Sequence, residues 1–343
     1  MKNTLEEIKK TGFKESILYR SIGKLDLLLL IILCSVVLYL FLIKNYYILS
    51  NGQTVSVTGW LWHAWGTDPD SEHGMIVPLI SLGLIWWKKD DLYPLYLKRG
   101  FHYVGLILLG SFFYILGNGG GVSLFGPVAL IIWILGVIGF IGGNTLFLKL
   151  LFPVGFLLFM VPWSLIGGDT ITVPLRHLMV NIVIPLLNLI GIHVVKVGTA
   201  ILSAPDPVLG IPAGKLFGLD VDNPCSGLRS LFALAMITAL FSNLTQPTQL
   251  KKWLLFACVF PLAILGNTMR IMMLTIGSYF FGTEFAVGIG NEISFFHMFA
   301  GYMVYISALG CMFLISYLMN LTPEQILRLK RLFLFKKIST SHS

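Results

Sequence analysis

The chain has 343 residues, of which 56% are hydrophobic and only 12% are charged. Soluble domains carry about twice that share of charge, so the composition excludes a soluble globular enzyme and indicates a polytopic membrane protein. The net charge of +8 does not indicate nucleic-acid binding, because the Lys and Arg residues lie between and beyond the apolar runs, as topology signals do.

Residues 1–26 are polar and show no signal-peptide pattern, so the first span is expected to insert by itself. After them come eight apolar segments near the length of about 20 residues that crosses a bilayer. They are 27–43, 74–89, 103–117, 122–141, 145–166, 226–242, 253–281 and 297–318. We therefore predict an all-α polytopic membrane protein with eight transmembrane helices. Its domains are a cytoplasmic segment 1–26, a membrane domain 27–318 and a basic cytoplasmic tail 319–343.

Residues 167–225 form the largest segment between predicted spans and are expected to make a small cap. Polar residues interrupt the apolar pattern of 173–195, which favours a helix lying at the membrane interface. The Gly and Pro spacing of 195–223 is typical of short strands and turns. The fold prediction therefore includes an interfacial helix and a strand-and-turn cap.

The orientation follows from the distribution of basic residues. If the N-terminus is cytoplasmic, the cytoplasmic stretches hold 18 of the 24 Lys and Arg residues. This bias predicts cytoplasmic termini and an extracytoplasmic cap in a multi-pass protein of the cell (inner) membrane.

Three reactive residues are predicted to lie at the extracytoplasmic end of the spans. Cys225 precedes the span 226–242, and His297 opens the last one. Arg270 lies 17 residues after Trp253, which is about 26 Å along a helix. The hydrocarbon core is about 30 Å thick, so Arg270 is expected near its outer boundary.

Each of these residues has a local reason to be reactive. Asn223 and Pro224 are typical of a helix start, which places Cys225 in a first turn, where the helix dipole favours a thiolate. The Arg270 guanidinium requires an anion such as a thiolate or an oxyanion. His297 can exchange a proton near neutral pH. Cysteine, histidine and arginine together suffice for acyl transfer through a thioester.

Five further residues are candidates for binding or support, and the first three have a structural alternative. Arg229 binds a substrate carboxylate or a lipid phosphate, or snorkels to the interface. Asn267 orients Arg270 or makes an interhelical hydrogen bond. His73 lines the substrate path or fixes the end of the second span. Ser226 and Gly227 adjoin Cys225, and Ser226 is expected to supply a hydroxyl or a backbone N–H to the oxyanion site.

The remaining cysteines, Cys34, Cys258 and Cys311, lie within predicted spans and are interpreted as structural. The sequence contains neither H-E-x-x-H nor C-x-x-C, so we expect neither a metal site nor a cofactor.

Four motifs, in this order and spacing, resemble the exosortase/archaeosortase family of membrane-embedded cysteine transpeptidases. They are "HG" at 73–74, "CSGLRS" at 225–230, "NTMR" at 267–270 and "HMFAG" at 297–301. The resemblance covers about residues 70–318. It implies that Cys225 is the nucleophile, that Arg270 stabilises the thiolate or oxyanion, and that His297 is the acid/base.

The resemblance also implies the partners. Members of that family process membrane-anchored proteins with a C-terminal sorting signal, which consists of a motif, one transmembrane helix and a basic tail. They cut outside the membrane and transfer the acyl group to a lipid or glycan-precursor acceptor. The expected partners are such substrates, an acceptor of this kind and membrane lipids, without nucleic acid. Two alternatives stay open: a transporter or channel for an anionic or lipid-linked solute, and a purely hydrolytic membrane protease.

Overall fold

The computed structural model describes residues 24–92, 99–220, 228–289, 292–322 and 325. The chain divides into two compact units, Met1–Ile166 and Gly167–Ser343. Each unit is described here by itself.

The regular elements among the described residues of the first unit are helices and one small hairpin. Its elements are α2 (Lys24–Val37) with a π-helical continuation (Leu38–Ile43), β1 (Tyr47–Ile48), β2 (Thr54–Val55), α3 (Val57–Thr67), a 3-10 turn (Glu72–Met75), α4 (Val77–Trp87), α5 (Lys89–Leu92), a second 3-10 turn (Phe101–Tyr103), α6 (Val104–Gly120), α7 (Phe125–Gly155) and a third 3-10 turn (Phe156–Met160). The helix α3 was not predicted, because it lies in a stretch too short to span.

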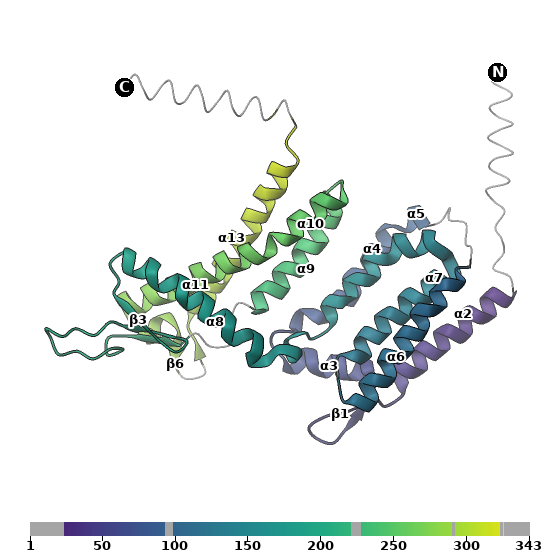
Figure 1. Ribbon diagram of the computed structural model, residues 1–343, viewed down its shortest axis with the longest axis horizontal. Helices are drawn as coiled ribbons and strands as arrows, with labels where there is room; N and C mark the ends of the chain where they lie inside the picture. Colours follow the sequence, from purple (N-terminus) through teal and green to yellow (C-terminus); the bar gives the residue numbers. More distant parts are fainter. Residues whose placement is uncertain (1–23, 93–98, 221–227, 290–291, 323–324, 326–343) are drawn as a thin grey trace. The chain divides into compact units, whose positions relative to one another are not determined.

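Helices α6 and α7 lie side by side because glycines remove side chains from their interface (Figure 1). A Cβ added at Gly136 would lie 2.9 Å from the backbone nitrogen of Ile107, and one added at Gly110 would lie 2.6 Å from the Trp133 ring. Small residues commonly let membrane helices approach in this way.

A sharp kink divides α7 into two arms. Gly143 has φ 65° and ψ −164°, a conformation that glycine alone adopts readily. The first arm packs along α6. The second packs along α4, where Ser81 Oγ donates to the Pro153 carbonyl at 2.8 Å. The two arms correspond to the predicted spans 122–141 and 145–166.

The second unit combines long helices with short strands. Helix α8 (Ser164–Leu189) leads into it, followed by β3 (Val194–Val197), β4 (Ala200–Ser203), β5 (Gly218–Asp220), α9 (Leu228–Thr245), α10 (Gln249–Ala257), α11 (Val259–Phe281), α12 (Thr283–Ala286), β6 (Gly288–Ile289), β7 (Glu292–Ile293) and α13 (Phe295–Met319).

The predicted strand-and-turn section is a three-stranded antiparallel sheet in the order β3-β4-β5. Ile201 faces Leu219 in its register. The sheet shares a buried core with α8 and α11, to which Val183, Leu187, Ile271 and Leu274 contribute fully buried side chains. The sheet therefore packs on the α11 segment beyond residue 270.

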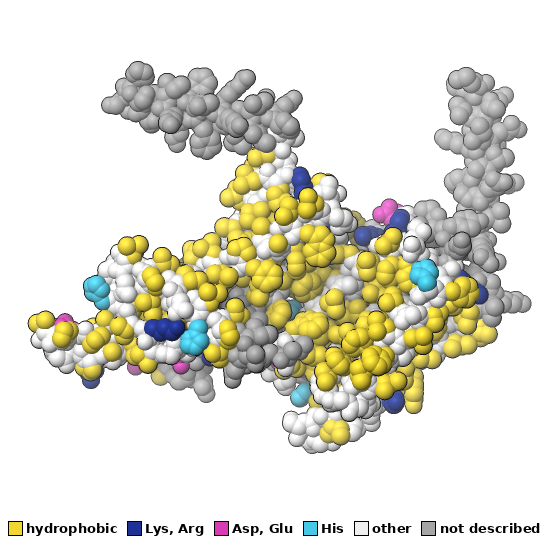
Figure 2. Space-filling model, viewed as in Figure 1, with side chains coloured by type: hydrophobic (Ala, Val, Ile, Leu, Met, Phe, Trp, Pro, Cys, Tyr) yellow, Lys and Arg dark blue, Asp and Glu magenta, His cyan; other side chains and the backbone are white. Residues whose placement is uncertain are grey.

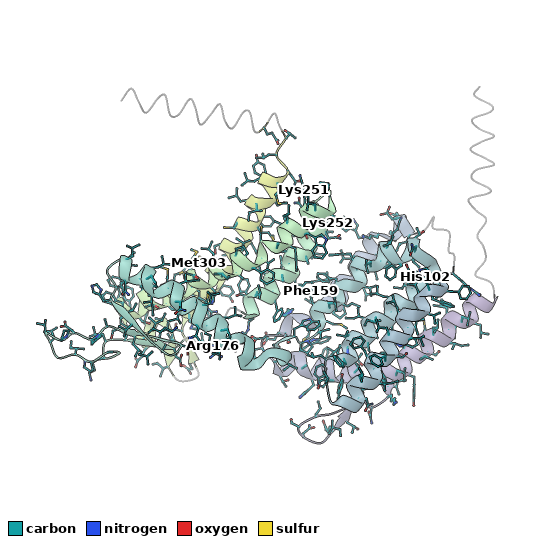
Figure 3. The ribbon with its side chains drawn as sticks, viewed as in Figure 1. His102, Phe159, Arg176, Lys251, Lys252 and Met303 are labelled. Carbon is teal, nitrogen blue, oxygen red and sulfur yellow. The ribbon has the colours of Figure 1, made fainter. Side chains whose placement is uncertain are left out.

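A second core joins α9, α10, α11 and α13 through Leu234, Leu255, Val259 and Met312. At one end of these helices, Lys251 Nζ donates to Asn320 Oδ1 at 3.0 Å, and Gln246 Nε2 donates to Ser316 Oγ at 2.7 Å. Figure 3 shows Lys251 and Lys252 at this end, away from β3. We call it the lysine end, and the opposite end, where β3–β7 lie, the strand end.

The structure confirms a polytopic helical membrane protein but not the predicted count of eight spans. Five helices in the described ranges are long and apolar enough to cross a membrane: Phe101–Gly120, Phe125–Met160, Thr172–Leu189, Gln249–Phe281 and Phe295–Met319. Three further apolar helices, Leu28–Ile43, Glu72–Trp87 and Arg229–Thr245, have only 10–17 residues. Figure 2 shows that apolar side chains cover most of the visible helical surface.

The count differs for two physical reasons. Apolar runs do not fix helix length: the predicted spans 27–43, 74–89 and 226–242 fall on the three apolar helices of 10–17 residues, and 122–141 and 145–166 fall together in the candidate span Phe125–Met160. Residues 173–189 of the segment expected to hold an interfacial helix lie in α8, whose part Thr172–Leu189 is long and apolar enough to span and adds a candidate that the predicted eight did not include. That helix ends before Gly191, which has φ 87°.

Candidate active site

The described part of the site is a direct contact between Arg270 on α11 and His297 in the first turn of α13. Arg270 Nη2 lies 2.7 Å from His297 Nε2, and both side chains are half-buried. The structure thus brings together two of the predicted catalytic residues from positions 27 residues apart in the chain. Their roles stay predictions.

Two glycines let α11 and α13 approach on either side of this contact. A Cβ at Gly266 would lie 2.8 Å from Val304 Cγ1, and one at Gly277 would lie 2.7 Å from the Phe296 ring. Gly266, Arg270 and Gly277 are separated by four and seven residues, so they share one face of α11. The contact therefore lies within a tightly packed helix pair.

The contact fixes the protonation of the imidazole. A guanidinium carries donors and no acceptor, so Nε2 must accept a hydrogen bond from Arg270. The neutral ring then carries its proton on Nδ1. Nδ1 is buried and has no hydrogen-bond partner among the described residues. An unsatisfied buried donor costs about 1–3 kcal/mol, so an acceptor placed at this nitrogen would stabilise the site.

Ser294 fixes the start of α13 and with it the backbone of His297. Its Oγ accepts a hydrogen bond from the His297 backbone nitrogen at 3.0 Å, as N-cap serines do. The same hydroxyl donates to the Ala286 carbonyl of α12 at 2.9 Å. The cap therefore links the candidate acid/base to α12, a relation that the sequence analysis missed although Ser294 stands three residues before His297.

Helix lengths place the start of α9 near the same level as the contact. Counting from the lysine end, Leu228 lies about 26 Å along α9, Arg270 about 28 Å along α10–α11 and His297 about 33 Å along α13, at 1.5 Å per residue. Arg229 is half-buried in the first turn of α9. Asn267 is 1% exposed on α11, one turn before Arg270.

Cys225, Ser226 and Gly227 lie outside the described residues. Cys225 precedes Leu228 by three residues.

His73 belongs to the first unit and adjoins a polar cluster that the sequence analysis did not identify. The Asp68 carboxylate accepts hydrogen bonds from Ser71 Oγ at 2.5 Å and from Ser164 Oγ. Gly74 follows His73 and packs against Trp65, where any Cβ would overlap the ring. The Trp65 indole donates to the Met160 carbonyl at 2.8 Å. These contacts fix the backbone around "HG". The polar cluster could have been predicted from the sequence, because Asp68 and Ser71 are only three residues apart.

A model of the transmembrane exosortase family matches residues 62–314, which is well over half of the chain. The chain belongs to the transmembrane exosortase family. Searches of curated proteins and of solved structures gave no match. Exosortases are membrane transpeptidases that process sorting signals. The matched range of this exosortase includes His73, Cys225, Arg270 and His297.

No group of three or more His, Cys, Asp or Glu side chains able to hold a metal ion occurs among the residues that the structure describes. The contact between Arg270 and His297 is suited to proton transfer and to stabilising negative charge.

Proposed function

We propose that this exosortase is a cysteine transpeptidase that cleaves C-terminal sorting signals of secreted proteins and transfers the new carboxyl end to a surface acceptor. The single observation that carries this proposal is the 2.7 Å contact between Arg270 and His297. Cys225 precedes Leu228 of α9 by three residues in the sequence, and the helix rise puts Leu228 near the level of that contact.

The reaction assigns one task to each residue. The Cys225 thiol gives its proton to His297 Nε2 as Arg270 leaves that nitrogen for the developing negative charge. The Cys225 sulfur then attacks the carbonyl carbon, and Arg270 stabilises the oxyanion. When the C–N bond breaks, the leaving nitrogen takes a proton from His297, and a thioester remains on Cys225.

The second half reverses these transfers. An acceptor O–H or N–H attacks the thioester carbon and gives its proton to His297. The C–S bond breaks and the sulfur leaves as a thiolate. Neither half needs an oxidant or a cofactor.

The proposed orientation places this chemistry outside the cytoplasm. Lys251 and Lys252 lie at the lysine end, and the stretches 243–252 and 319–343, which adjoin that end along the chain, hold seven basic residues against two, Lys196 and Lys215, in the strand section 190–220. The positive-inside rule therefore favours a cytoplasmic lysine end. The strand end, with β3–β7 and the contact, is then extracytoplasmic, where a secreted protein presents its sorting signal.

The test replaces Cys225 and follows a co-expressed membrane reporter that carries a C-terminal sorting signal from the same genome. Cys225→Ala and Cys225→Ser should each abolish processing, so the reporter stays full-length on an immunoblot. The matched controls are Cys258→Ser and Cys311→Ser, which should process it normally. Normal processing by Cys225→Ala would overturn the proposal and favour a transporter.

Mass spectrometry of the processed reporter distinguishes transfer from hydrolysis. A transpeptidase leaves an adduct on the new C-terminal carboxyl group, whereas a hydrolase leaves a free carboxylate. A free carboxylate in intact cells would replace the proposal with a membrane protease.

A further inference from the structure

An apolar hollow opens beside the turn that carries His297. Its volume is about 430 Å³, and its lining residues are Glu284, Phe285, Ser294, Phe295, Phe296 and Phe299. They come from α12 and from the beginning of α13. Four of the six are phenylalanines, and none of the six belongs to the proposed catalytic set.

The walls of the hollow are fixed relative to His297. Ser294 bonds both the His297 backbone and the Ala286 carbonyl. The Phe285 and Phe296 rings pack with their centroids 5.3 Å apart, and Phe296 also lies against Gly277. Movement of the hollow would therefore move the acid/base.

The chemistry of the hollow calls for an apolar occupant. Phe295 is 79% exposed, and Phe285 and Phe299 are 48% and 40% exposed. Burying apolar surface is favourable by about 25 cal/mol per Å², and concave apolar sites beside reactive groups commonly bind ligands. Glu284 is exposed, so its carboxylate can stay in water when the hollow is filled.

The proposed reaction brings a suitable occupant to this place. His297 must reach the nitrogen at which the leaving segment begins. Each further residue of that segment can lie at most about 3.3–3.6 Å farther from this nitrogen. Phe295 and Phe296 directly precede His297, and Phe299 follows it by two residues. In a sorting signal, the leaving segment continues into an apolar helix.

We propose that the hollow is a specificity subsite that binds large apolar side chains of the leaving segment, just C-terminal to the cleaved bond. This inference rests on the proposed function. The subsite selects substrates whose leaving segment begins with residues such as Leu or Phe, and it disfavours charged residues at the same positions.

The first experiment measures binding without catalysis. Reporters with a photo-crosslinking phenylalanine at successive positions of the leaving segment are co-expressed with the full-length Cys225→Ala chain. One or two adjacent positions should crosslink to residues 284–299. Phe295→Ala and Phe299→Ala should weaken that crosslink severalfold. Phe280→Ala is the matched control, since Phe280 is 66% exposed at the same end but does not line the hollow.

The second experiment measures selectivity with Cys225 intact. Phe299→Ala should raise KM for a Leu-containing leaving segment roughly tenfold, as expected for lost apolar contacts in a pocket, with little change in kcat. It should leave KM for an Ala-containing segment nearly unchanged. If Phe295→Ala and Phe299→Ala both behave as Phe280→Ala does, or if the hollow crosslinks only to lipid, the subsite is overturned.

The outcomes separate this inference from the proposed function. If cleavage depends on Cys225 but does not change in Phe295→Ala and Phe299→Ala, the subsite proposal is overturned and the transpeptidase proposal stands. If the crosslink weakens in Phe299→Ala but the protein with Cys225 intact never cleaves the reporter, the transpeptidase proposal is overturned and the binding site stands.

Discussion

At the scale of single residues, the contact between Arg270 and His297 sets the chemistry of the site. A guanidinium next to Nε2 opposes a second proton on the ring, because two donors would then face each other. The resting imidazole is therefore neutral and carries its proton on Nδ1. In the proposed reaction, His297 acts as a general acid only after Arg270 has moved, which couples proton transfer to the appearance of negative charge.

This coupling predicts a measurable tautomer. Nitrogen NMR of ¹⁵N-histidine-labelled protein should show the His297 ring neutral at pH 7 with its proton on Nδ1, identified by difference from His297→Asn. Arg270→Gln should populate the Nε2–H tautomer, because a glutamine oxygen can accept from Nε2. Arg270→Lys should retain the Nδ1–H form, since an ammonium also only donates. A wild-type ring protonated on Nε2 would contradict the assignment.

At the scale of secondary-structure elements, close packing of α11 and α13 holds the contact in place. Gly266 and Gly277 lie on the Arg270 face of α11 and meet Val304 and Phe296 of α13. Val304 is β-branched and stiff, so it cannot rotate away from an added methyl group. The helices themselves would have to separate, and the guanidinium would move away from the imidazole.

We therefore predict that Gly266→Ala lowers stability and activity together. The overpacked interface should cost about 1–3 kcal/mol, seen as a lower Tm in detergent, and reporter processing should fall at least tenfold. The matched control is Gly310→Ala on α13, outside the four motifs, where an added Cβ meets nothing within 4 Å. That substitution should leave processing unchanged and keep or raise Tm, because Ala favours helix over Gly. Equal effects at the two positions would show that the interface is not under this constraint.

At the scale of the whole molecule, the distribution of basic residues predicts which end of the second unit faces the cytoplasm. The stretches predicted to be cytoplasmic hold 18 of the 24 basic residues, and two of these, Lys251 and Lys252, lie at the end opposite the strands (Figure 3). The sheet β3-β4-β5, by contrast, carries the exposed turn that contains Val208, which is 91% exposed.

Labelling with a membrane-impermeant maleimide tests this orientation. In a Cys225→Ala background, Val208→Cys should be labelled in intact cells or spheroplasts. Leu250→Cys, at a 69% exposed position near the lysine end, should be labelled only after the membrane is opened. The reverse pattern would place the Arg270–His297 contact on the cytoplasmic side and would rule out the proposed reaction with secreted substrates.

The sequence by itself determined the class of the protein, the strand section of the cap and the levels of Arg270 and His297. Apolar content, Gly and Pro spacing and the rise per residue are local properties, and they can be read without knowing what packs against what. The motifs at 73–74, 225–230, 267–270 and 297–301 also sufficed to identify the family, which the match over residues 62–314 confirmed.

Only the tertiary structure decided the features that depend on contacts between distant segments. The joining of two predicted spans in Phe125–Met160 and the apolar part Thr172–Leu189 of α8 changed the number of candidate spans, since helix boundaries depend on packing and backbone conformation as well as on apolar runs. The choice of ring nitrogen on His297, the glycine contacts that bring α11 to α13, and the phenylalanine hollow beside them all require two segments to meet. Sequence spacing fixes depth along a helix, whereas the direction in which a side chain meets its neighbour is set by packing.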